Sequence, residues 1–190
     1  MKIIGISASP QKNGNTAWAI NKILESAKEQ GAETQSWSFG DLDIKPCRGC
    51  WACKKGDKGC IVNDDMQKLY EAMIHTDTII LGSPVYMGQM TAQAKIFTDR
   101  LFACSSPRFS PYFKEAAAKK KMFLLFTQGN PDSGKFQAYF DYTKSMFQIL
   151  EFDVKGLYVV AGLRTEPAFE RKDLPTVMKE IGISLVSAGE

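Results

Sequence analysis

The sequence has few of the features that would assign it to a specialised class of protein. No stretch approaches the roughly 18 consecutive apolar residues that a membrane-spanning helix needs. The net charge is only +3, with 24 Lys and Arg against 21 Asp and Glu, which gives no case for nucleic acid binding. The apolar run at the N-terminus breaks at Gly5 and lacks the longer apolar core and cleavage site of a secretory signal. We therefore expect a soluble, cytoplasmic protein with neither a nucleic acid nor a membrane partner.

Histidine, the side chain most often used in acid–base catalysis, is also scarce. The one histidine, His75, falls at the predicted C-terminal end of a helix, where a positive charge suits the helix dipole. We assign it no catalytic role and expect no protein side chain to act as acid or base. The dinucleotide pattern G-x-G-x-x-G is missing after the first strand. Residues 129–135 spell G-x-x-x-x-G-K, but Phe136 replaces the Ser or Thr that would bind magnesium, and Asp132 opposes phosphate binding.

Apolar runs alternate with helical patterns along the whole chain, which predicts the α/β class with a parallel sheet. We expect strands at residues 2–7, 33–39, 78–83, 121–128 and 154–160, and helices at 16–31, 64–77, 91–102, 135–151 and roughly 168–188. Five β-α units without a linker or repeat predict one flavodoxin-like domain over residues 1–190, with a doubly wound sheet of order 2-1-3-4-5. Ligands of such sheets bind at the carboxyl ends of the strands, which directs attention to loops 7–15, 83–90 and 127–134.

The loop after the first strand, SASPQKNGNT at residues 7–16, is rich in hydroxyl and amide side chains. Residues 1–24 contain no Asp or Glu, so nothing in this segment repels an anion. A helix is predicted to begin at the end of the loop, and the unpaired N–H groups of a helix N-terminus bind phosphate. The loop therefore predicts a phosphate site, with an ordinary polar turn that caps the helix as the alternative.

The loop after the third strand, GSPVYMGQM at residues 82–90, carries apolar side chains where loops usually expose polar ones. Val85, Tyr86 and Met87 would offer a surface for a flat heteroaromatic ring. The alternative is that they cover the edge of the sheet or a dimer contact. Residues 127–129, after the fourth strand, are predicted to line the far side of the same ring site.

Four of the five cysteines lie in one short stretch, CRGCWACKKGDKGC, with the spacing C-x2-C-x2-C-x6-C. They are Cys47, Cys50, Cys53 and Cys60. In a reducing cytoplasm, clustered cysteines more often bind metals or take part in redox chemistry than form disulfides. Four basic side chains surround them, and positive charge favours thiolates and offsets the negative charge of a bound cluster: Arg48, Lys54, Lys55 and Lys58.

Three states of these cysteines fit the pattern. Four thiolates are the ligand set of a [4Fe–4S] cluster. They also suit structural zinc, although zinc sites usually pair two knuckles from separate places in the chain. Free or oxidised thiols are the third alternative. The fifth cysteine, Cys104, stands beside Phe102 and Ala103 and is interpreted as a buried, small apolar residue.

Three motifs together resemble the NAD(P)H-dependent FMN reductases of flavodoxin-like fold: SASPQKNGNT, GSPVYMG, and K-x3-DR at Lys95, Asp99 and Arg100. With the cysteine motif, the chain is similar to the iron-sulfur flavoproteins of archaea and anaerobic bacteria, from Met1 to about Leu163. The resemblance implies FMN and one [4Fe–4S] cluster per subunit, electron exchange with ferredoxin, and assembly as homodimers or homotetramers.

Carried over by position, the resemblance implies FMN contacts at eleven residues. The phosphate end would be Ser7, Ser9, Gln11, Asn15 and Thr16, and the ring end would be Pro84, Val85, Tyr86, Met87, Gly88 and Thr127. The cluster would be held by Cys47, Cys50, Cys53 and Cys60. One departure matters, because the family often has Arg at the position of Gln11. A neutral amide loses the bidentate charged contact, and Lys12 would compensate only as a point charge.

We therefore expect a flavin-dependent oxidoreductase in which the cluster passes electrons from a donor such as ferredoxin to FMN and on to a small acceptor. One alternative is an NAD(P)H-dependent FMN or quinone reductase without a working cluster. Another, from a different class, is a non-catalytic zinc-stabilised interaction protein or redox sensor.

Overall fold

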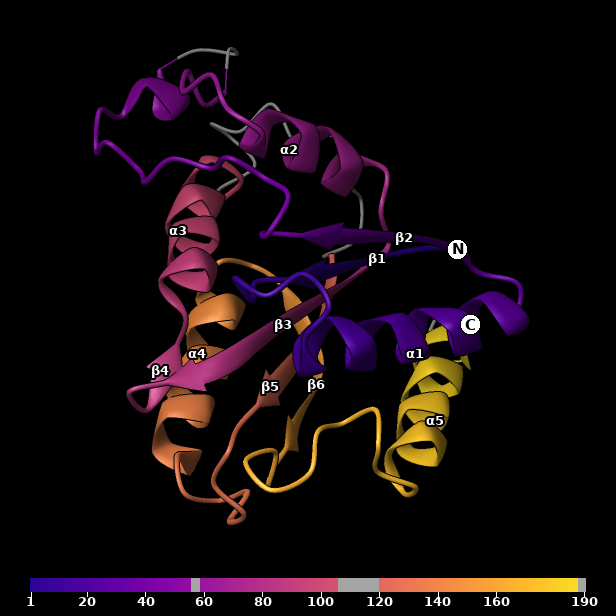
Figure 1. Ribbon diagram of the computed structural model, residues 1–190. Helices are drawn as coiled ribbons and strands as arrows, with labels where there is room; N and C mark the ends of the chain where they lie inside the picture. Colours follow the sequence, from indigo (N-terminus) through magenta and orange to yellow (C-terminus); the bar gives the residue numbers. More distant parts are fainter. Residues whose placement is uncertain (56–58, 106–119, 188–190) are drawn as a thin grey trace.

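The computed structural model describes residues 1–55, 59–105 and 120–187. Its parallel sheet is built from β1 (Lys2–Ser7), β2 (Glu33–Ser38), β3 (Thr78–Tyr86), β5 (Lys121–Thr127) and β6 (Asp153–Val160). The strands lie side by side in the order β2-β1-β3-β5-β6 (Figure 1). Counting only these five strands, this is the predicted order 2-1-3-4-5, so the flavodoxin-like topology is confirmed.

Helices cover both faces of the sheet, because alternate residues of each central strand point to opposite sides. In β1, Ile3 packs with α1 (Asn15–Glu29) and α5 (Leu174–Ser187), whereas Ile4 and Ile6 pack on the other face. That second face is covered by α2 (Met66–Ile74), α3 (Ala92–Arg100) and α4 (Gln137–Ile149), as Figure 1 shows. The result is a three-layer arrangement with an apolar core on each side of the sheet.

Two glycines let α1 approach the sheet closely. A Cβ atom on Gly5 would lie 2.3 Å from Ile20 Cγ2, and one on Gly82 would lie 2.6 Å from Ile20 Cδ1. Both distances are shorter than real side chains tolerate, so the strands carry no side chain at these points. The N-terminus of α1 is thereby held against the ends of β1 and β3.

The structure differs from the sequence-based expectation at a few boundaries. The last helix begins at Leu174, so the prediction that it starts near residue 168 was wrong. The backbone N–H of Ala168 instead donates to Asn15 Oδ1 at 2.7 Å, which ties this segment to the start of α1. A two-residue strand, β4 (Gln89–Met90), pairs antiparallel with the end of β3 and was not predicted.

Short 3-10 turns occupy Ala52–Lys54 and Leu101–Ala103. Most of the predicted connection 103–117 lies outside the described residues. Within the part of the chain that is described, no helix is both long and apolar enough to cross a bilayer.

Candidate functional site: a flavin pocket and a cysteine pocket

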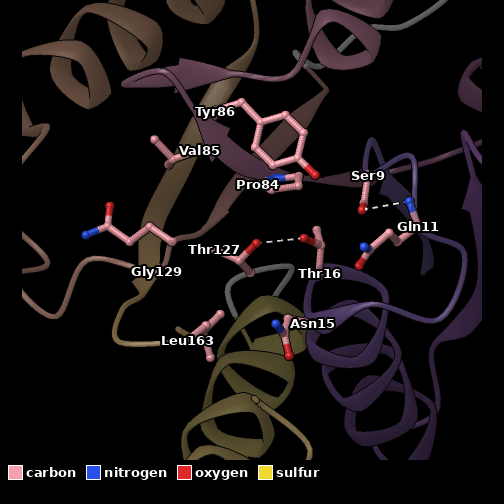
Figure 2. A pocket seen from close by; sticks show the side chains of 11 residues that line it. Ser9, Gln11, Asn15, Thr16, Pro84, Val85, Tyr86, Thr127, Gly129 and Leu163 are labelled. Carbon is pink, nitrogen blue, oxygen red and sulfur yellow. Dashed lines mark hydrogen bonds between the residues drawn. The ribbon is translucent and has the colours of Figure 1, made fainter. Parts of the chain in front are cut away.

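A polar pocket opens where β1, β3 and β5 end, next to the start of α1 (Figure 2). Its volume is about 170 Å³. Eight of the eleven residues predicted to contact FMN line it: Ser9, Gln11, Asn15, Thr16, Pro84, Val85, Tyr86 and Thr127. Loops that are far apart in the sequence converge here because the carboxyl ends of parallel strands meet at one edge of a sheet.

The phosphate end of this pocket is the N-terminus of α1. Gly14 precedes the helix and provides no side chain to accept from the first-turn N–H groups. Such N–H groups have no partner within the helix, and together with the helix dipole they favour an anion. The Ser9 hydroxyl accepts a hydrogen bond from the Gln11 N–H at 3.1 Å, which fixes the loop around this end. The arrangement suits a phosphate.

Thr16 and Thr127 join the helix to the end of β5. Their hydroxyl oxygens lie 2.7 Å apart, and both residues are buried although they line the pocket. Figure 2 shows the pair on the floor of the pocket, between Pro84 and Asn15. This hydrogen bond therefore fixes the position of Thr16, a predicted phosphate contact, relative to Thr127, a predicted ring contact.

The opposite wall of the pocket is formed by the end of β3. Pro84, Val85 and Tyr86 line it, and Tyr86 is 48% exposed. Met87 and Gly88 form the turn to β4, with positive φ values of 51° and 82°, and neither lines the pocket. Met87 is fully exposed, so the structure does not bring this predicted contact to the pocket wall.

Two buried oxygens near the pocket lack a partner within the described residues. Gln128 donates through Nε2 to the carbonyl oxygens of Asn130 and Asp132, at 3.2 and 2.7 Å, which leaves its Oε1 as an unpaired acceptor. The Ser7 hydroxyl, at the end of β1, is the other. Buried polar atoms are rarely left without a hydrogen bond, so both atoms fit a ligand with donors and acceptors of its own, as FMN is.

Other residues complete the pocket. Gln128 and Gly129 line it on the side predicted for residues 127–129. Leu163 also lines it, and sequence reasoning missed this residue because it considered the loops after the first, third and fourth strands but not the loop after the last strand. In the G-x-x-x-x-G-K stretch, the N–H of Gly134 donates to Asp132 Oδ1 at 2.9 Å and is not free for a phosphate.

The role of Lys12 as a compensating point charge stays a prediction. Lys12 forms an ion pair with Asp41, and both side chains are more than half exposed. Gln11 lines the pocket as a neutral amide.

The four clustered cysteines line a second pocket, separate from the first. Its walls also include the buried side chain of Arg100 and the aromatic rings of Trp51 and Phe102, which meet edge to face at 5.3 Å between ring centroids. Cys47 and Cys50 are exposed, and Cys53 and Cys60 are partly buried. Residues 56–58, between the third and fourth cysteine, lie outside the described residues.

The four cysteines of this pocket form no disulfide within the described part of the chain. Burial raises the pKa of Cys53, and the neighbouring Lys54 opposes that shift. Lys54 is held in place because its Nζ donates to the Ser105 carbonyl at 2.5 Å and lies 4.5 Å from the centre of the Phe102 ring. Cys104 is buried, as predicted, and burial raises its pKa strongly.

The chemistry of the donor set fits an iron–sulfur cluster, which takes four thiolates. Among the residues that the structure describes, no three Cys, His, Asp or Glu side chains gather closely enough to hold one metal ion. The four thiols share the walls of one pocket without converging on a single point.

The similarity to solved structures supports the fold. A NAD(P)H:quinone oxidoreductase from Methanothermobacter marburgensis superimposes with a TM-score of 0.73, covering 97% of this chain and 98% of the other at 11% identity. A flavodoxin from the domain Archaea superimposes with a TM-score of 0.60, covering 99% and 98% at 14% identity. At such low identity these likenesses speak for the fold alone.

Relatives by sequence are named iron-sulfur flavoproteins. One from Methanosarcina thermophila is 42% identical over 118 residues, which are 62% of this chain and 61% of that protein. One from Methanocaldococcus jannaschii is 44% identical over 100 residues, which are 53% of this chain and 51% of the relative. The matches thus span about half or somewhat more of these curated relatives.

The family model described as NADPH-dependent FMN reductase matches residues 1–161, which include every strand of the sheet and both pockets except Leu163. The chain therefore belongs to the NADPH-dependent FMN reductase family.

Proposed function

We propose that the chain is a flavin-dependent oxidoreductase that binds FMN in the pocket beside α1 and a [4Fe–4S] cluster in the cysteine pocket. The observation that carries the proposal is the presence of both pockets in one fold. One gathers eight of the predicted flavin contacts, and the other gathers all four clustered thiols. Among the described residues that line the flavin pocket there is no Asp, Glu, His or Lys, and a bound flavin would carry out the redox chemistry itself.

The residues of the flavin pocket have distinct tasks. The N–H groups at the start of α1 bind the phosphate, with Ser9, Gln11 and Thr16 adding hydrogen bonds. The end of β3 presents Pro84, Val85 and Tyr86 to the ring and orients it. Gln128 offers a fixed acceptor to a donor of the ligand. FMN, when bound, supplies one- and two-electron chemistry, while these residues hold and orient it.

Helix α3 connects the two pockets. Its N-cap, Thr91, donates to the Ala8 carbonyl at 2.6 Å and accepts from the Ala94 N–H at 3.1 Å, beside the flavin pocket. Its last residue, Arg100, lines the cysteine pocket. A helix of nine residues is roughly 14 Å long, so one rigid element sets the separation of the two sites.

We further propose ferredoxin or NAD(P)H as the donor and a small molecule, such as a quinone, an oxygen species or another flavin, as the acceptor. The names of the relatives support the cluster, and the family match supports NAD(P)H. The proposed assembly is a homodimer or homotetramer.

The test is a visible spectrum of protein purified without oxygen, combined with assays of flavin, iron, sulfide and zinc on the same sample. The proposal predicts one FMN per chain and four iron and four sulfide per chain. A Cys50→Ala variant should lose iron and electron flow from reduced ferredoxin but keep FMN. Full iron content and unchanged electron flow in that variant would contradict the cluster.

A second candidate is an NAD(P)H-dependent reductase without a working cluster, which the family match favours. Rapid bleaching of the flavin by NADPH in protein that holds no iron would support it. Colourless protein with stoichiometric zinc and no flavin would instead support an interaction protein or sensor.

A further inference from the structure

Arg100 is held rigidly at the end of α3 although its side chain is almost fully buried. Its Nη1 donates to Asp64 Oδ2 at 2.6 Å and to the Lys45 carbonyl at 2.8 Å, and its Nη2 donates to Asp64 Oδ1 at 3.1 Å. The Arg100 and Asp64 side chains are 1% and 0% exposed. The two terminal nitrogens of the guanidinium are therefore engaged on one side of the group.

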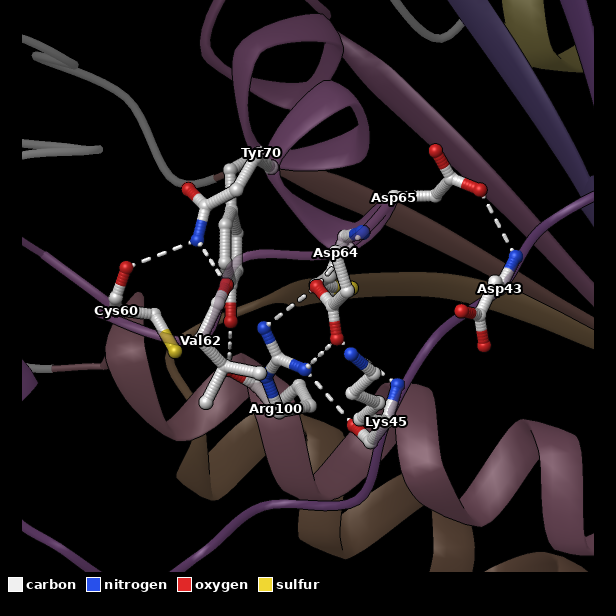
Figure 3. Close-up of polar contacts among 10 residues, drawn as sticks. Asp43, Lys45, Cys60, Val62, Asp64, Asp65, Tyr70 and Arg100 are labelled. Carbon is white, nitrogen blue, oxygen red and sulfur yellow. Dashed lines mark hydrogen bonds and ion pairs between the residues drawn. The ribbon is translucent and has the colours of Figure 1, made fainter.

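The partner of Arg100 is fixed as well. Asp64 accepts hydrogen bonds from the backbone N–H groups of Lys45 and Met66, at 2.8 and 3.1 Å. The Tyr70 hydroxyl donates to the Arg100 carbonyl at 2.7 Å, which holds the end of the helix (Figure 3). A bidentate arginine pair anchored in this way has no freedom to rotate. The direction of every N–H of the guanidinium is consequently determined by the fold.

One of the three nitrogens of this group has no partner. The Nε–H of Arg100 is buried and has no hydrogen-bond partner in the described part of the chain. A buried donor without a partner costs about 1–3 kcal/mol. Natural proteins rarely tolerate this except where a ligand, ion or water satisfies the group.

The unused donor belongs to a side chain that lines the cysteine pocket. Arg100 shares the pocket wall with all four clustered cysteines. In Figure 3 the Asp64 carboxylate lies on one side of the guanidinium, and Cys60 and Val62 lie on the other. The Tyr70 ring also packs against this side chain, with its centroid 5.9 Å from Arg100 Cζ.

We propose that the Nε–H of Arg100 donates a hydrogen bond to a sulfur of the cluster bound in the cysteine pocket, on the side of Cys60, and so raises the cluster's reduction potential. The inference rests on the proposed function, since it requires the cluster to be present. Hydrogen bonds to sulfur and nearby positive charge both stabilise the more negative, reduced form of a cluster. Asp64 holds the guanidinium, and the otherwise unsatisfied Nε–H would be the donor to the cluster.

The experiment compares the midpoint potential and iron content of three proteins after anaerobic reconstitution: the parent chain, Arg100→Lys and Arg48→Gln. Lysine keeps a positive charge for Asp64 but has no Nε–H. We expect full iron content and an equilibrium constant for reduction about tenfold lower, which is about 59 mV for a one-electron couple. Arg48 lines the same pocket but is exposed, so its loss should change the potential much less.

An unchanged potential in Arg100→Lys with four iron per chain would overturn this inference and leave the cluster proposal standing. A parent chain without iron would overturn both. If Arg100→Lys fails to fold, the hydrogen bond is tested in an Arg48→Gln chain labelled with ¹⁵N-arginine. Magnetic resonance of the reduced cluster should then detect a weakly coupled arginine nitrogen, and a spectrum without that coupling would contradict the inference.

Discussion

The ion pair between Asp64 and Arg100 illustrates how one contact decides both stability and site geometry. The sequence predicted a helix over residues 64–77, but α2 begins at Met66, and the Asp64 carboxylate pairs with Arg100. Burial raises the pKa of Asp64, and hydrogen bonds from Arg100 and the Lys45 N–H outweigh that effect, so the pKa lies below its ordinary value. No local pattern predicts this pair, because its members are 36 residues apart.

The first prediction concerns the pH dependence of this pair. Asp64→Asn should lower the free energy of unfolding by about 3–5 kcal/mol at neutral pH, because it leaves a buried guanidinium without its counter-charge. A folded pKa below the unfolded value of about 3.9 means that the carboxylate stabilises the fold above that pH. The stabilisation is lost as the pH falls through the folded pKa. Urea unfolding of both proteins from pH 7 to pH 3 measures this.

The matched control is Asp65→Asn. The pKa of Asp65 is also lowered, mainly by a hydrogen bond from Lys68, but the lysine of that pair is mostly exposed, so the loss of stability should be much smaller. A stability difference between the parent and Asp64→Asn that stays constant down to pH 3 would argue against the assigned protonation.

The second prediction concerns the hydroxyl pair of Thr16 and Thr127. Removing one hydroxyl with valine leaves the other buried and unpaired, so each single variant should lose about 1 kcal/mol of unfolding free energy without cofactor. The double variant replaces both partners by similar shapes and should lose less than the sum of the two. A double-mutant cycle by urea unfolding measures the coupling. Additive losses would indicate that the two hydroxyls act independently.

At the scale of elements, α1 and α5 pack unusually closely on one face of the sheet. Ser26 donates from its hydroxyl to the Lys179 carbonyl at 2.9 Å, and Gly182 faces the Ile23 carbonyl across the contact. A Cβ on Gly182 would lie only 2.5 Å from that oxygen, which belongs to the backbone and cannot move aside easily. The glycine is thus required by the approach of two helices.

The third prediction follows from this contact. Gly182→Ala should destabilise the protein by about 1–3 kcal/mol, because the added methyl forces the helices apart. Helix propensity alone would predict that Gly182→Ala raises the free energy of unfolding by roughly 1 kcal/mol. The packing clash and the helix propensity therefore have opposite effects on stability. Ser184→Ala, on an exposed part of the same helix, is the control and should change little. Thermal unfolding of the three proteins separates packing from propensity, and a stabilised Gly182→Ala would refute the packing argument.

The elements themselves could be predicted from sequence with good success where apolar periodicity was long. The five parallel strands and five α-helices of the described residues were foreseen. The buried strands β1, β3 and β5 are continuous apolar runs, whereas β2 is polar and largely exposed. The two-residue strand β4 has no periodicity to detect. The start of the last helix was misjudged because residues 168–173 are held by a contact with Asn15, which local sequence does not reveal.

The two pockets likewise have features that local sequence predicts and features that depend on tertiary contacts. The flavin loops could be located because the topology sends the ends of β1, β3 and β5 to one edge of the sheet. The unpaired oxygen of Gln128 and the unused N–H of Arg100 depend on which partners each side chain already has, and only the three-dimensional structure provides that. The sequence thus predicts where ligands bind better than it predicts which atoms remain free to bind them.

At the scale of the whole molecule, FMN binding should raise the stability of the folded protein, because FMN would contact residues from three strands and one helix. A ligand that binds only the folded state stabilises it by about 2.7 kcal/mol at a concentration of one hundred times its Kd. The fourth prediction is that FMN raises the unfolding temperature of the apoprotein more than riboflavin at equal concentration, since riboflavin has no phosphate for the start of α1. Calorimetric scans with each flavin measure the difference.

Gln11→Arg sharpens this prediction, because it places a charged donor where the chain has a neutral amide. A guanidinium adds a charge and a second parallel N–H that an amide cannot offer to the phosphate, so FMN should bind roughly five- to tenfold more tightly while riboflavin binding stays the same. The gain should shrink as salt is added, because the loop is open to solvent and its charges are screened. If the affinity for both flavins rises equally, residue 11 does not contact the phosphate. FMN would then have to bind in the opposite orientation in the pocket.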